Sequence, residues 1–389
     1  MSLIFPPNKR PLRVGILGGG QLGRMLGQAA LDWDLEVWVL DADPSFPAAG
    51  SCTRLVPGNF SDYEDVYQFG QQVDIVTVEI EHVNTQALHQ LKAEGKPVHP
   101  DPAALDIIKD KGLQNEFYDR HQIPTAKFEC FDGPEAVWDA VASGKWTLPF
   151  VQKSRKAGYD GRGVLVVREA SDMEQLLEGA CVLEEMGPID KELAVIVARN
   201  PSGQTVAFPA VEMAFHPTAN LVEFLSCPAA ISPELEAEAE ALAVKVIESF
   251  DLCGLLAVEL FLTDNGELLV NEVAPRPHNS GHHTIESCYT SQYQQHLRAL
   301  LDLPLGSTRL KSPAVMINLL GAPDHKGPAQ YEGFQSALQL PGVFFHSYGK
   351  ALTSPYRKMG HVTVIAPTLE EAVEKARKVQ DLIQVTSTV

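Results

Sequence analysis

Two glutamates, Glu259 and Glu272, are spaced to meet across a β-hairpin. Asn265-Gly266 lies between them and is typical of a two-residue type I′ turn, which places Glu259 opposite Glu272. Like charges in such a position destabilise a sheet unless something compensates them. A divalent cation would compensate them, because hard cations take carboxylate oxygens as ligands. We predict a metal site here; the alternative is a pair that is merely tolerated at an exposed strand end.

The same turn sets the pairing of the neighbouring residues. It pairs Phe261 with Val270 and Leu262 with Leu269, and these apolar pairs indicate that both strands are buried. Asn271 would add a third oxygen ligand, but strict alternation of side chains points it to the opposite face. We therefore expect a β-bulge near Asn271, or a different contribution from it.

Residues 18–23, Gly-Gly-Gly-Gln-Leu-Gly, match the G-x-G-x-x-G pattern between an expected strand and an expected helix. Asp41 follows at the end of the next strand, as in a dinucleotide-binding unit. Small residues let any phosphate approach the backbone N–H groups of a helix N-terminus. The pattern therefore favours an anion site over a purely structural turn, without requiring NAD.

Lys153 ends an apolar segment and is followed by a glycine-rich loop over residues 157–163. A lysine beside such a loop is well placed to meet phosphate oxygens. The loop is expected either to be a mobile lid, ordered by nucleotide, or to be an ordinary hairpin loop. It lacks the G-x-x-x-x-G-K-[ST] pattern of P-loop NTPases. Lys111 is by itself typical of a solvated helix residue.

A histidine-rich turn follows Glu272 and contains Arg276, His278, Asn279 and Ser280. Its spacing does not suit zinc, whereas all four side chains can donate hydrogen bonds to an anion. A second basic group lies near the C-terminus: Lys350, Arg357, Lys358 and His361. In an acidic chain this group indicates a local site for an anionic substrate, with a solvated basic loop as the alternative.

The elements that position these residues alternate between strands and helices over residues 13–100, which predicts a parallel, doubly wound sheet. Prolines near residue 100 indicate a boundary, and a helix is expected over 106–120. The middle of the chain has strand patterns and a long amphipathic helix over 233–250. Residues 312–389 resemble a small α/β unit. We predict domains over 1–104, 105–310 (two subdomains split near 185) and 311–389.

Composition excludes several functional classes. The formal net charge of −19 argues against a nucleic-acid partner. The six cysteines include no C-x-x-C pair, which disfavours a zinc ribbon or a redox motif. No apolar run is long enough for a membrane span, and residues 1–11 lack the apolar core of a signal peptide. We expect a cytoplasmic protein with no membrane partner.

Taken together, these residues resemble the ATP-grasp superfamily and, within it, the 5-(carboxyamino)imidazole ribonucleotide synthetases of purine biosynthesis. The resemblance covers nearly the whole chain. It is most specific at residues 19–25, 158–163, 271–282 and 357–361, and it includes 316–321. It implies an α/β ATP-grasp fold with an N-terminal Rossmann-like (pre-ATP-grasp) domain and a small C-terminal α/β domain.

The resemblance also implies roles for individual residues. Glu184 to Gly187 would line the adenine site, Glu192 would bind the ribose hydroxyls, and Tyr159, Asp160, Arg276 and His278 are candidates for catalysis. The metal would lie between Glu259 and Glu272. The implied ATP contacts are Lys111, Lys153, Gly158, Tyr159, Asp160, Gly161, Arg162, Gly163, Glu184, Glu185, Met186, Gly187, Glu192, Asn271 and Glu272. The implied substrate contacts are Gln21, Leu22, Glu79, Arg276, His278, Asn279, Ser280, Lys350, Arg357 and Lys358.

The reaction that the resemblance implies is carboxylation of aminoimidazole ribonucleotide with ATP, Mg²⁺ and bicarbonate through carboxyphosphate. Either carboxyphosphate or carbon dioxide released from it would then meet the exocyclic amine. A homodimer and transfer of the product to a downstream mutase are implied as well. Phe215 stands where a histidine is expected near the nucleotide, with His216 next to it, which leaves that contact open. The alternatives are formate-dependent transformylation of glycinamide ribonucleotide, an NAD-dependent dehydrogenase, and a nucleotide sensor without turnover.

Overall fold

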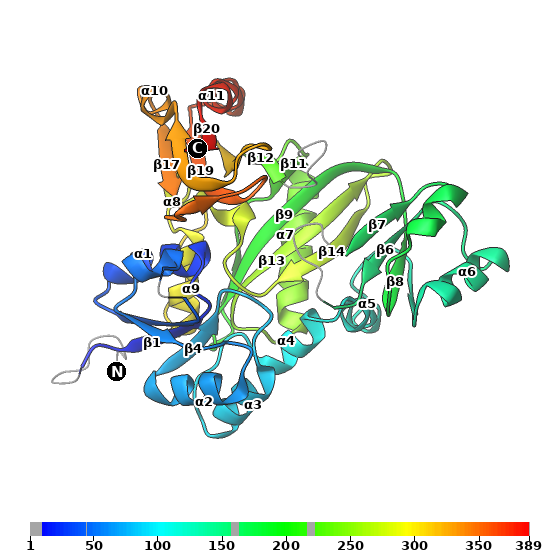
Figure 1. Cartoon of the computed structure of the whole chain (residues 1–389), viewed down its shortest axis with the longest axis horizontal. Helices are drawn as coiled ribbons and strands as arrows, with labels where there is room; N and C mark the ends of the chain where they lie inside the picture. Colours follow the sequence, from blue (N-terminus) through cyan, green and yellow to red (C-terminus); the bar gives the residue numbers. More distant parts are fainter. Residues whose placement is uncertain (1–9, 44, 157–162, 216–221, 389) are drawn as a thin grey trace.

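The computed structural model describes residues 10–43, 45–156, 163–215 and 222–388. Its first part is a four-stranded parallel sheet with the strand order β3-β2-β1-β4 (Figure 1), which confirms the predicted α/β start of the chain. The elements are β1 (Arg13–Leu17), α1 (Gln21–Leu31), β2 (Glu36–Asp41), β3 (Arg54–Pro57), α2 (Tyr63–Gln72), β4 (Ile75–Val78) and α3 (Thr85–Ala93).

Helices cover both faces of this sheet, as in a doubly wound fold. Successive strand residues point to opposite faces. Ile16 therefore packs in one cluster with Met25 of α1, whereas Leu17 packs in another with Phe69 of α2 and Leu88 of α3. The carboxyl end of β1 leads directly into the glycine-rich turn, which the sheet holds at its edge.

The single helix predicted over 106–120 is wrong, because the structure has two helices there. They are α4 (Pro102–Ile108) and α5 (Lys111–Arg120). The break occurs at Asp110. Its carboxylate accepts hydrogen bonds from the backbone N–H groups of Gly112 and Leu113 and so caps a new helix. As a result, Lys111 begins α5 instead of lying on the exposed face of a longer helix.

A small antiparallel sheet follows, with the order β5-β8-β6-β7. It contains the strands predicted near Lys153 and near Glu184. Its core is formed by Phe150, Val167 and Leu183, among others, which pack together with the ring of Trp146. The elements are β5 (Phe128–Phe131), α6 (Pro134–Ala142), β6 (Phe150–Ser154), β7 (Val164–Val167) and β8 (Cys181–Glu185).

A nine-stranded sheet forms the centre of the molecule, with the order β14-β13-β9-β11-β12-β15-β19-β17 and with β10 paired to β9. Helix α7 (Pro233–Ser249) packs on it through Val246, in one cluster with Val195 and Val258. The strands are β9 (Ile189–Arg199), β10 (Thr205–Ala207), β11 (Val211–Phe215), β12 (Val222–Cys227), β13 (Gly254–Thr263), β14 (Leu268–Ala274), β15 (Ala314–Leu320), β17 (Val343–Ser347) and β19 (Lys358–Ile365).

This large sheet continues from the middle of the chain into its C-terminal part, because β12 pairs with β15. Helix α9 packs against α1, with Tyr293 and Met25 in one cluster, and α11 covers β15 and β19. The remaining elements are α8 (Thr284–Ser287), α9 (Gln292–Leu300), β16 (Gly327–Glu332), α10 (Phe334–Ala337), β18 (Leu352–Thr353), α11 (Leu369–Leu382) and β20 (Gln384–Ser387).

The hairpin of β13 and β14 confirms that Glu259 faces Glu272. The predicted two-residue turn is wrong, however. The backbone N–H of Thr263 donates to the carbonyl oxygen of Glu267 at 2.9 Å, so the loop consists of residues 264–266. Gly266 adopts a φ of 81°, a left-handed conformation that glycine takes without the steric cost of a side chain.

The longer loop shifts the pairing near the turn by one residue. Leu262 pairs with Leu268 and Phe261 with Leu269, so both predicted apolar pairs are wrong. A register shift after Glu259 then inserts Asn271 as an unpaired residue. This is the β-bulge predicted near Asn271, and it cancels the effect of the longer loop. The two glutamates therefore meet as predicted.

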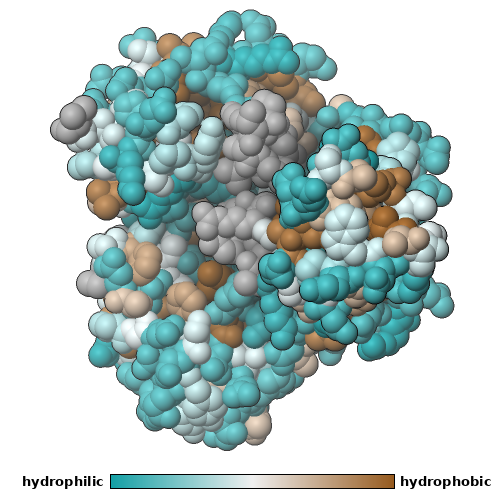
Figure 2. All heavy atoms as spheres, turned by 45° about the vertical axis from the view of Figure 1, so that its right-hand side comes forward, coloured by the Kyte–Doolittle hydropathy of each residue, from teal (hydrophilic) through white to brown (hydrophobic). Residues whose placement is uncertain are grey.

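The surface agrees with the acidic composition. Hydrophilic residues cover most of the molecular face in Figure 2, as a net charge of −19 would suggest. Among the helices in the described part of the chain, none is both long enough and apolar enough to cross a bilayer. The residues that could carry chemistry lie at the edges of the three sheets described above and in the loops between them.

Candidate active site

Two buried or half-buried lysines meet three oxygen-bearing side chains beside the central hairpin. The Nζ atom of Lys153, on β6, lies 2.6 Å from Oε2 of Glu184 on β8 and donates a hydrogen bond to Oδ1 of Asn271 at 2.8 Å. Lys111, at the start of α5, forms an ion pair with Glu272. The structure thus gathers five of the predicted ATP contacts from four separate elements.

The electrostatics of the glutamate pair differ between its two members. Burial, followed by the charge of Glu272, raises the pKa of Glu259. Lys111 is the main cause that lowers the pKa of Glu272. Glu272 thus has a lysine beside it, whereas Glu259 has no positive charge equally close among the described residues. A buried carboxylate in this position is the environment expected of a cation site.

Asn271 does not add an oxygen to this pair in the structure, because its Oδ1 atom accepts from Lys153. Within the described residues, no group of three or more His, Cys, Asp and Glu side chains is arranged to hold a metal ion. The carboxylates of Glu259 and Glu272 alone could therefore hold a divalent cation, with oxygens of a bound nucleotide needed to complete its coordination.

The glycine-rich turn is occupied by carboxylates of the protein itself. Glu79, which follows β4, accepts hydrogen bonds from the backbone N–H groups of Gly20 and Gly23. Asp41 accepts from the N–H group of Gly19 at 2.7 Å. These N–H groups are therefore already bonded to side chains of the protein, and the ligand anion site that the glycines predict stays a prediction. Burial raises the pKa of Glu79.

The first turn of α1 contains the predicted substrate contacts Gln21 and Leu22. Gln21 is half-buried, whereas the side chain of Leu22 is buried in the cluster that contains Met25. The side chain of Leu22 therefore belongs to the core, and only its backbone could contact a ligand. At Gly20, a Cβ atom would lie 2.6 Å from a carboxylate oxygen of Glu79, which explains why a glycine is needed there.

The histidine-rich turn lies next to the glutamate pair. His278 Nε2 is 3.7 Å from Oε1 of Glu259, and His278 Nδ1 is 2.9 Å from the hydroxyl of Ser280. The amide of Asn279 forms two hydrogen bonds with the amide of Asn318 on β15, at 2.8 and 2.9 Å. The side chains of Ser280 and Asn279 thus hold the turn in place.

The basic C-terminal group reaches the same region. Lys358 is one of the charges that lower the pKa of Glu259, so its ammonium group lies within electrostatic range of the facing glutamates Glu259 and Glu272. The ammonium group of Lys350 donates a hydrogen bond to the carbonyl oxygen of Lys358 at 2.7 Å. The exposed Arg357 donates a hydrogen bond to the carbonyl oxygen of Leu352. The tail therefore folds back towards the site.

His361 does not belong to the basic group. It is fully buried, and its ring stacks on that of His346 at 4.4 Å and lies 4.7 Å from that of His282. Burial lowers the pKa of His361 and of His282, so both stay neutral. These histidines pack where the N-terminal and C-terminal parts meet. His278 is the histidine of the turn that lies next to a carboxylate of the facing glutamates, that of Glu259.

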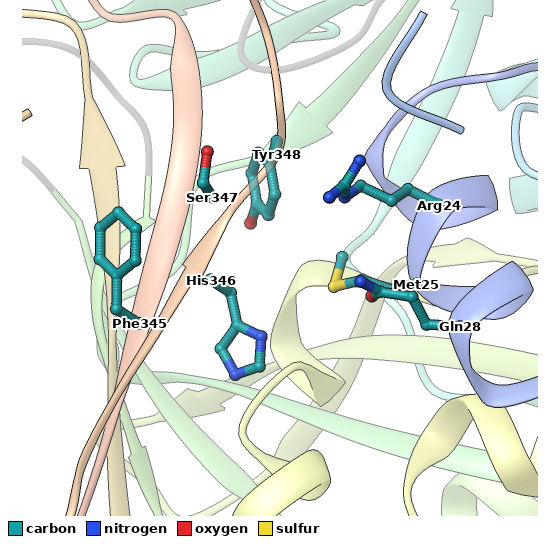
Figure 3. Close-up of a pocket in the computed structure, with 7 residues that line it drawn as sticks. All are labelled: Arg24, Met25, Gln28, Phe345, His346, Ser347 and Tyr348. Carbon is teal, nitrogen blue, oxygen red and sulfur yellow. The ribbon is translucent and has the colours of Figure 1, made fainter. Parts of the chain in front are cut away.

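A cavity of about 300 Å³ lies between α1 and β17 and is lined in part by His346 (Figure 3). The guanidinium group of Arg24 points into it towards the ring of Tyr348, and donates one hydrogen bond to the carbonyl oxygen of Pro47. None of its lining residues is among the predicted site residues. The residues that line it are Arg24, Met25, Gln28, Phe345, His346, Ser347 and Tyr348.

The remaining predicted nucleotide contacts lie between and beside the strands. Glu185 is exposed at the end of β8, Met186 and Gly187 connect it to β9, and Glu192 is half-buried on β9, where burial raises its pKa. Gly163 precedes β7 with a φ of 73°. The other loop predictions, Gly158, Tyr159, Asp160, Gly161 and Arg162, lie outside the described residues, as does His216.

Sequence reasoning missed two residues of the site. Glu81 forms an ion pair with Arg276, and Asn318 holds Asn279. A signal existed for Glu81, because it is a second carboxylate two residues after Glu79, just beyond an expected strand. Asn318 lies within the motif 316–321, but nothing in the sequence pairs it with a turn so distant along the chain.

Comparisons with known proteins match three segments of the chain. The ribonucleotide synthetase preATP-grasp domain matches residues 12–109, the ATP-grasp domain matches 116–293, and the phosphoribosylaminoimidazole carboxylase C-terminal domain matches 314–375. An N5-carboxyaminoimidazole ribonucleotide synthase from Synechococcus elongatus is 36% identical over 95% of this chain and 93% of its own length. The chain belongs to the N5-carboxyaminoimidazole ribonucleotide synthetase family.

Solved structures of this synthetase family agree with the assignment. The synthetase from Thermotoga maritima has a TM-score of 0.89 and 40% identity, covering 97% of this chain and all of its own. A synthase from Aspergillus clavatus, in complex with ADP and 5-aminoimidazole ribonucleotide, has a TM-score of 0.86 and 34% identity, covering 96% and 98% of the two chains. The chain spans about two thirds of the length of several curated phosphoribosylaminoimidazole carboxylases that it also matches.

Proposed function

We propose that this chain carboxylates the amine of 5-aminoimidazole ribonucleotide, with ATP and bicarbonate as co-substrates, in purine biosynthesis. The observation that carries the proposal is the position of Glu259 and Glu272 between two groups of side chains. On one side are Lys111 and Lys153, and on the other is His278 of the anion-binding turn. The Aspergillus clavatus relative that binds ADP and 5-aminoimidazole ribonucleotide supports the choice of substrate.

Lys111 and Lys153 are proposed to bind the phosphates of ATP. In the structure their ammonium groups pair with Glu272 and Glu184, so phosphate oxygens would take over positions that carboxylates now fill. The loop 158–163 is proposed to cover the phosphates, Glu184 to Gly187 to contact the adenine, and Glu192 to accept from the ribose hydroxyls.

The ribonucleotide is proposed to bind between the glycine-rich turn and the C-terminal part. Gln21, the backbone of Leu22 and Glu79 would contact the ribose side. Lys350, Arg357 and Lys358 would bind the phosphate, because charge-assisted hydrogen bonds to phosphate are about twice as strong as neutral ones. Arg276, His278, Asn279 and Ser280 form the turn between this substrate and the metal pair.

Mg²⁺ is the proposed metal, and Glu259 and Glu272 are the residues that would hold it. When bound, it neutralises negative charge on the phosphates of ATP. The facing carboxylates fit this role because the pKa of Glu259 is raised by burial and by the second glutamate, which indicates an environment short of positive charge.

The chemical steps are two displacements. An oxygen of bicarbonate attacks the γ-phosphorus of ATP, the bond to the β-phosphate oxygen breaks, and ADP leaves together with formation of carboxyphosphate. The amine nitrogen of the ribonucleotide then bonds to the carboxyl carbon, phosphate leaves and the nitrogen loses a proton. This chain must exclude water between the steps, since water would hydrolyse carboxyphosphate. Asp160 and His278 are the candidates to accept the proton.

Magnesium binding should depend on pH. Glu259 has its pKa raised to about 8 in the metal-free protein, so below that pH it carries a proton that the cation must displace. The affinity for Mg²⁺ should therefore increase about tenfold per pH unit between pH 6 and 8 and level off above that range. Calorimetric titration in buffers of different ionisation enthalpy should show close to one proton released at pH 7. An affinity that stays constant from pH 6 to 8 would contradict the assignment of Glu259.

The proposed reaction is tested by ADP release from the purified chain with ATP and 5-aminoimidazole ribonucleotide, with and without bicarbonate. We expect release to require both bicarbonate and the ribonucleotide. Release that instead required formate and glycinamide ribonucleotide would support transformylation, the alternative within the same fold. Binding of ATP without any release would indicate a nucleotide sensor.

Three further features remain proposals. We propose that the chain forms a homodimer, that its product passes to a mutase, and that it acts in the cytoplasm. The first two rest on the family, in which the carboxylated amine is an intermediate. The third rests on the six free cysteines, which suit a reducing compartment.

A further inference from the structure

An ion pair joins the N-terminal part of the molecule to the end of the catalytic hairpin. Arg276, which follows β14, has its Nε atom 2.8 Å from Oε1 of Glu81, which follows β4. Their side chains are only 19% and 17% exposed, so solvent screens the pair weakly. The attraction between the two charges holds the guanidinium group near Glu81, while its Nη1 atom donates a hydrogen bond to the carbonyl oxygen of Pro277 at 3.1 Å.

A second carboxylate competes for the same arginine. Glu79 lies two residues before Glu81, and the charge of Arg276 is among the causes that lower its pKa. Glu79 is itself held by the backbone N–H groups of Gly20 and Gly23. Without Glu81, the guanidinium would be attracted to Glu79 and so towards the glycine-rich turn, away from the hairpin.

The position of Arg276 makes its direction important. It lies two residues before His278, which is 3.7 Å from Glu259 of the metal pair. Its charge also acts on Glu79, a proposed contact of the ribonucleotide. Arg276 thus lies between the place where carboxyphosphate would form and the place where the amine would accept the carboxyl group.

We infer that Glu81 is a positioning residue that holds Arg276 between these two places, so that carboxyphosphate is retained until the amine attacks it. This inference rests on the proposed function. In this proposal Glu81 acts through the guanidinium group, with which it is paired, and not by binding a substrate. If Arg276 turns towards Glu79, carboxyphosphate loses a cationic partner, and water converts it to bicarbonate and phosphate before the carboxyl group is transferred.

The test is the ratio of ADP released to ribonucleotide carboxylated, with ¹³C-bicarbonate used to measure the product. The wild-type chain should give a ratio near one. Glu81→Ala should give a ratio several times higher, with carboxylation slowed by roughly ten- to a hundredfold and the KM for ATP within about twofold. Glu81→Asp, which keeps the charge, should recover much of the coupling. A merely structural role would reduce both products together and leave the ratio at one.

Glu36→Ala is a matched control, because Glu36 pairs with Nε of Arg13 at 2.9 Å, and the two side chains are 25% and 28% exposed. This pair lies on β1 and β2, away from the site, and its loss should leave the ratio at one. If Glu81→Ala is too unstable to measure, Glu81→Gln keeps the size of the side chain and should still raise the ratio. A ratio of one in folded Glu81→Ala or Glu81→Gln protein would overturn the inference. Wild-type ADP release that is independent of bicarbonate would overturn the proposed function instead.

Discussion

Glu272→Gln should lower turnover by roughly a hundred- to ten-thousandfold, which corresponds to the several kcal/mol that a metal ion contributes to charge stabilisation. The substitution removes one of the two carboxylates that face each other across the hairpin, and it also removes the ionic partner of Lys111. The fold should persist, because glutamine matches glutamate in size and its side-chain oxygen can still accept a hydrogen bond from Lys111. Steady-state ADP release at increasing Mg²⁺ concentration measures the effect, and thermal unfolding checks the fold.

Glu267→Gln is the matched control for this prediction. Glu267 lies in the same hairpin, at the exposed end near the turn, and should be replaceable without effect on turnover. Near-normal ADP release by Glu272→Gln at saturating Mg²⁺ would show that the metal does not depend on this carboxylate.

Arg357→Ala should raise the KM for the ribonucleotide about ten- to a hundredfold, as expected for the loss of a charged hydrogen bond of about 1.5–3 kcal/mol. Arg357 is exposed, and its guanidinium donates to the carbonyl oxygen of Leu352, so it is available to a ligand at modest cost. The KM for ATP should change little, because Lys111 and Lys153 lie in the middle of the chain. Lys350→Ala should likewise raise the KM for the ribonucleotide and change the KM for ATP little.

The control for the basic tail is Arg377→Ala. Arg377 is exposed on α11, in the same C-terminal part of the chain, and its loss removes one positive charge without touching the proposed site. It should leave both constants unchanged. If Arg357→Ala raises the KM for ATP and not that for the ribonucleotide, the tail belongs to the nucleotide site and the division of the chain proposed above is wrong.

The glutamate pair shows how far sequence reasoning reaches. Its pairing was predicted from Asn265-Gly266, yet the true loop is one residue longer and a bulge at Asn271 compensates for it. Hairpin loops with glycine in the left-handed conformation occur with either length, so the dipeptide alone does not decide between them. The need for a bulge could be predicted, since Asn271 otherwise points away from the site. The length of the loop could not.

Other parts of the site depend on contacts that no local pattern records. The parallel sheet followed from the alternation of strands and helices, whereas the break at Asp110 required recognition of an aspartate cap within a helical pattern. The ion pair of Glu81 with Arg276 joins residues that are 195 positions apart in the sequence. Only the folded structure brings such residues together.

The most direct test of the central claim follows the oxygen atoms of bicarbonate. With ¹⁸O-labelled bicarbonate, ATP and 5-aminoimidazole ribonucleotide, the phosphate released should carry one ¹⁸O atom, because a bicarbonate oxygen bonds to the γ-phosphorus and stays there when the amine displaces phosphate. Mass spectrometry of the phosphate, recorded within a time too short for label to exchange with water, measures this transfer. Phosphate without label, formed together with the carboxylated ribonucleotide, would contradict carboxyphosphate as the intermediate.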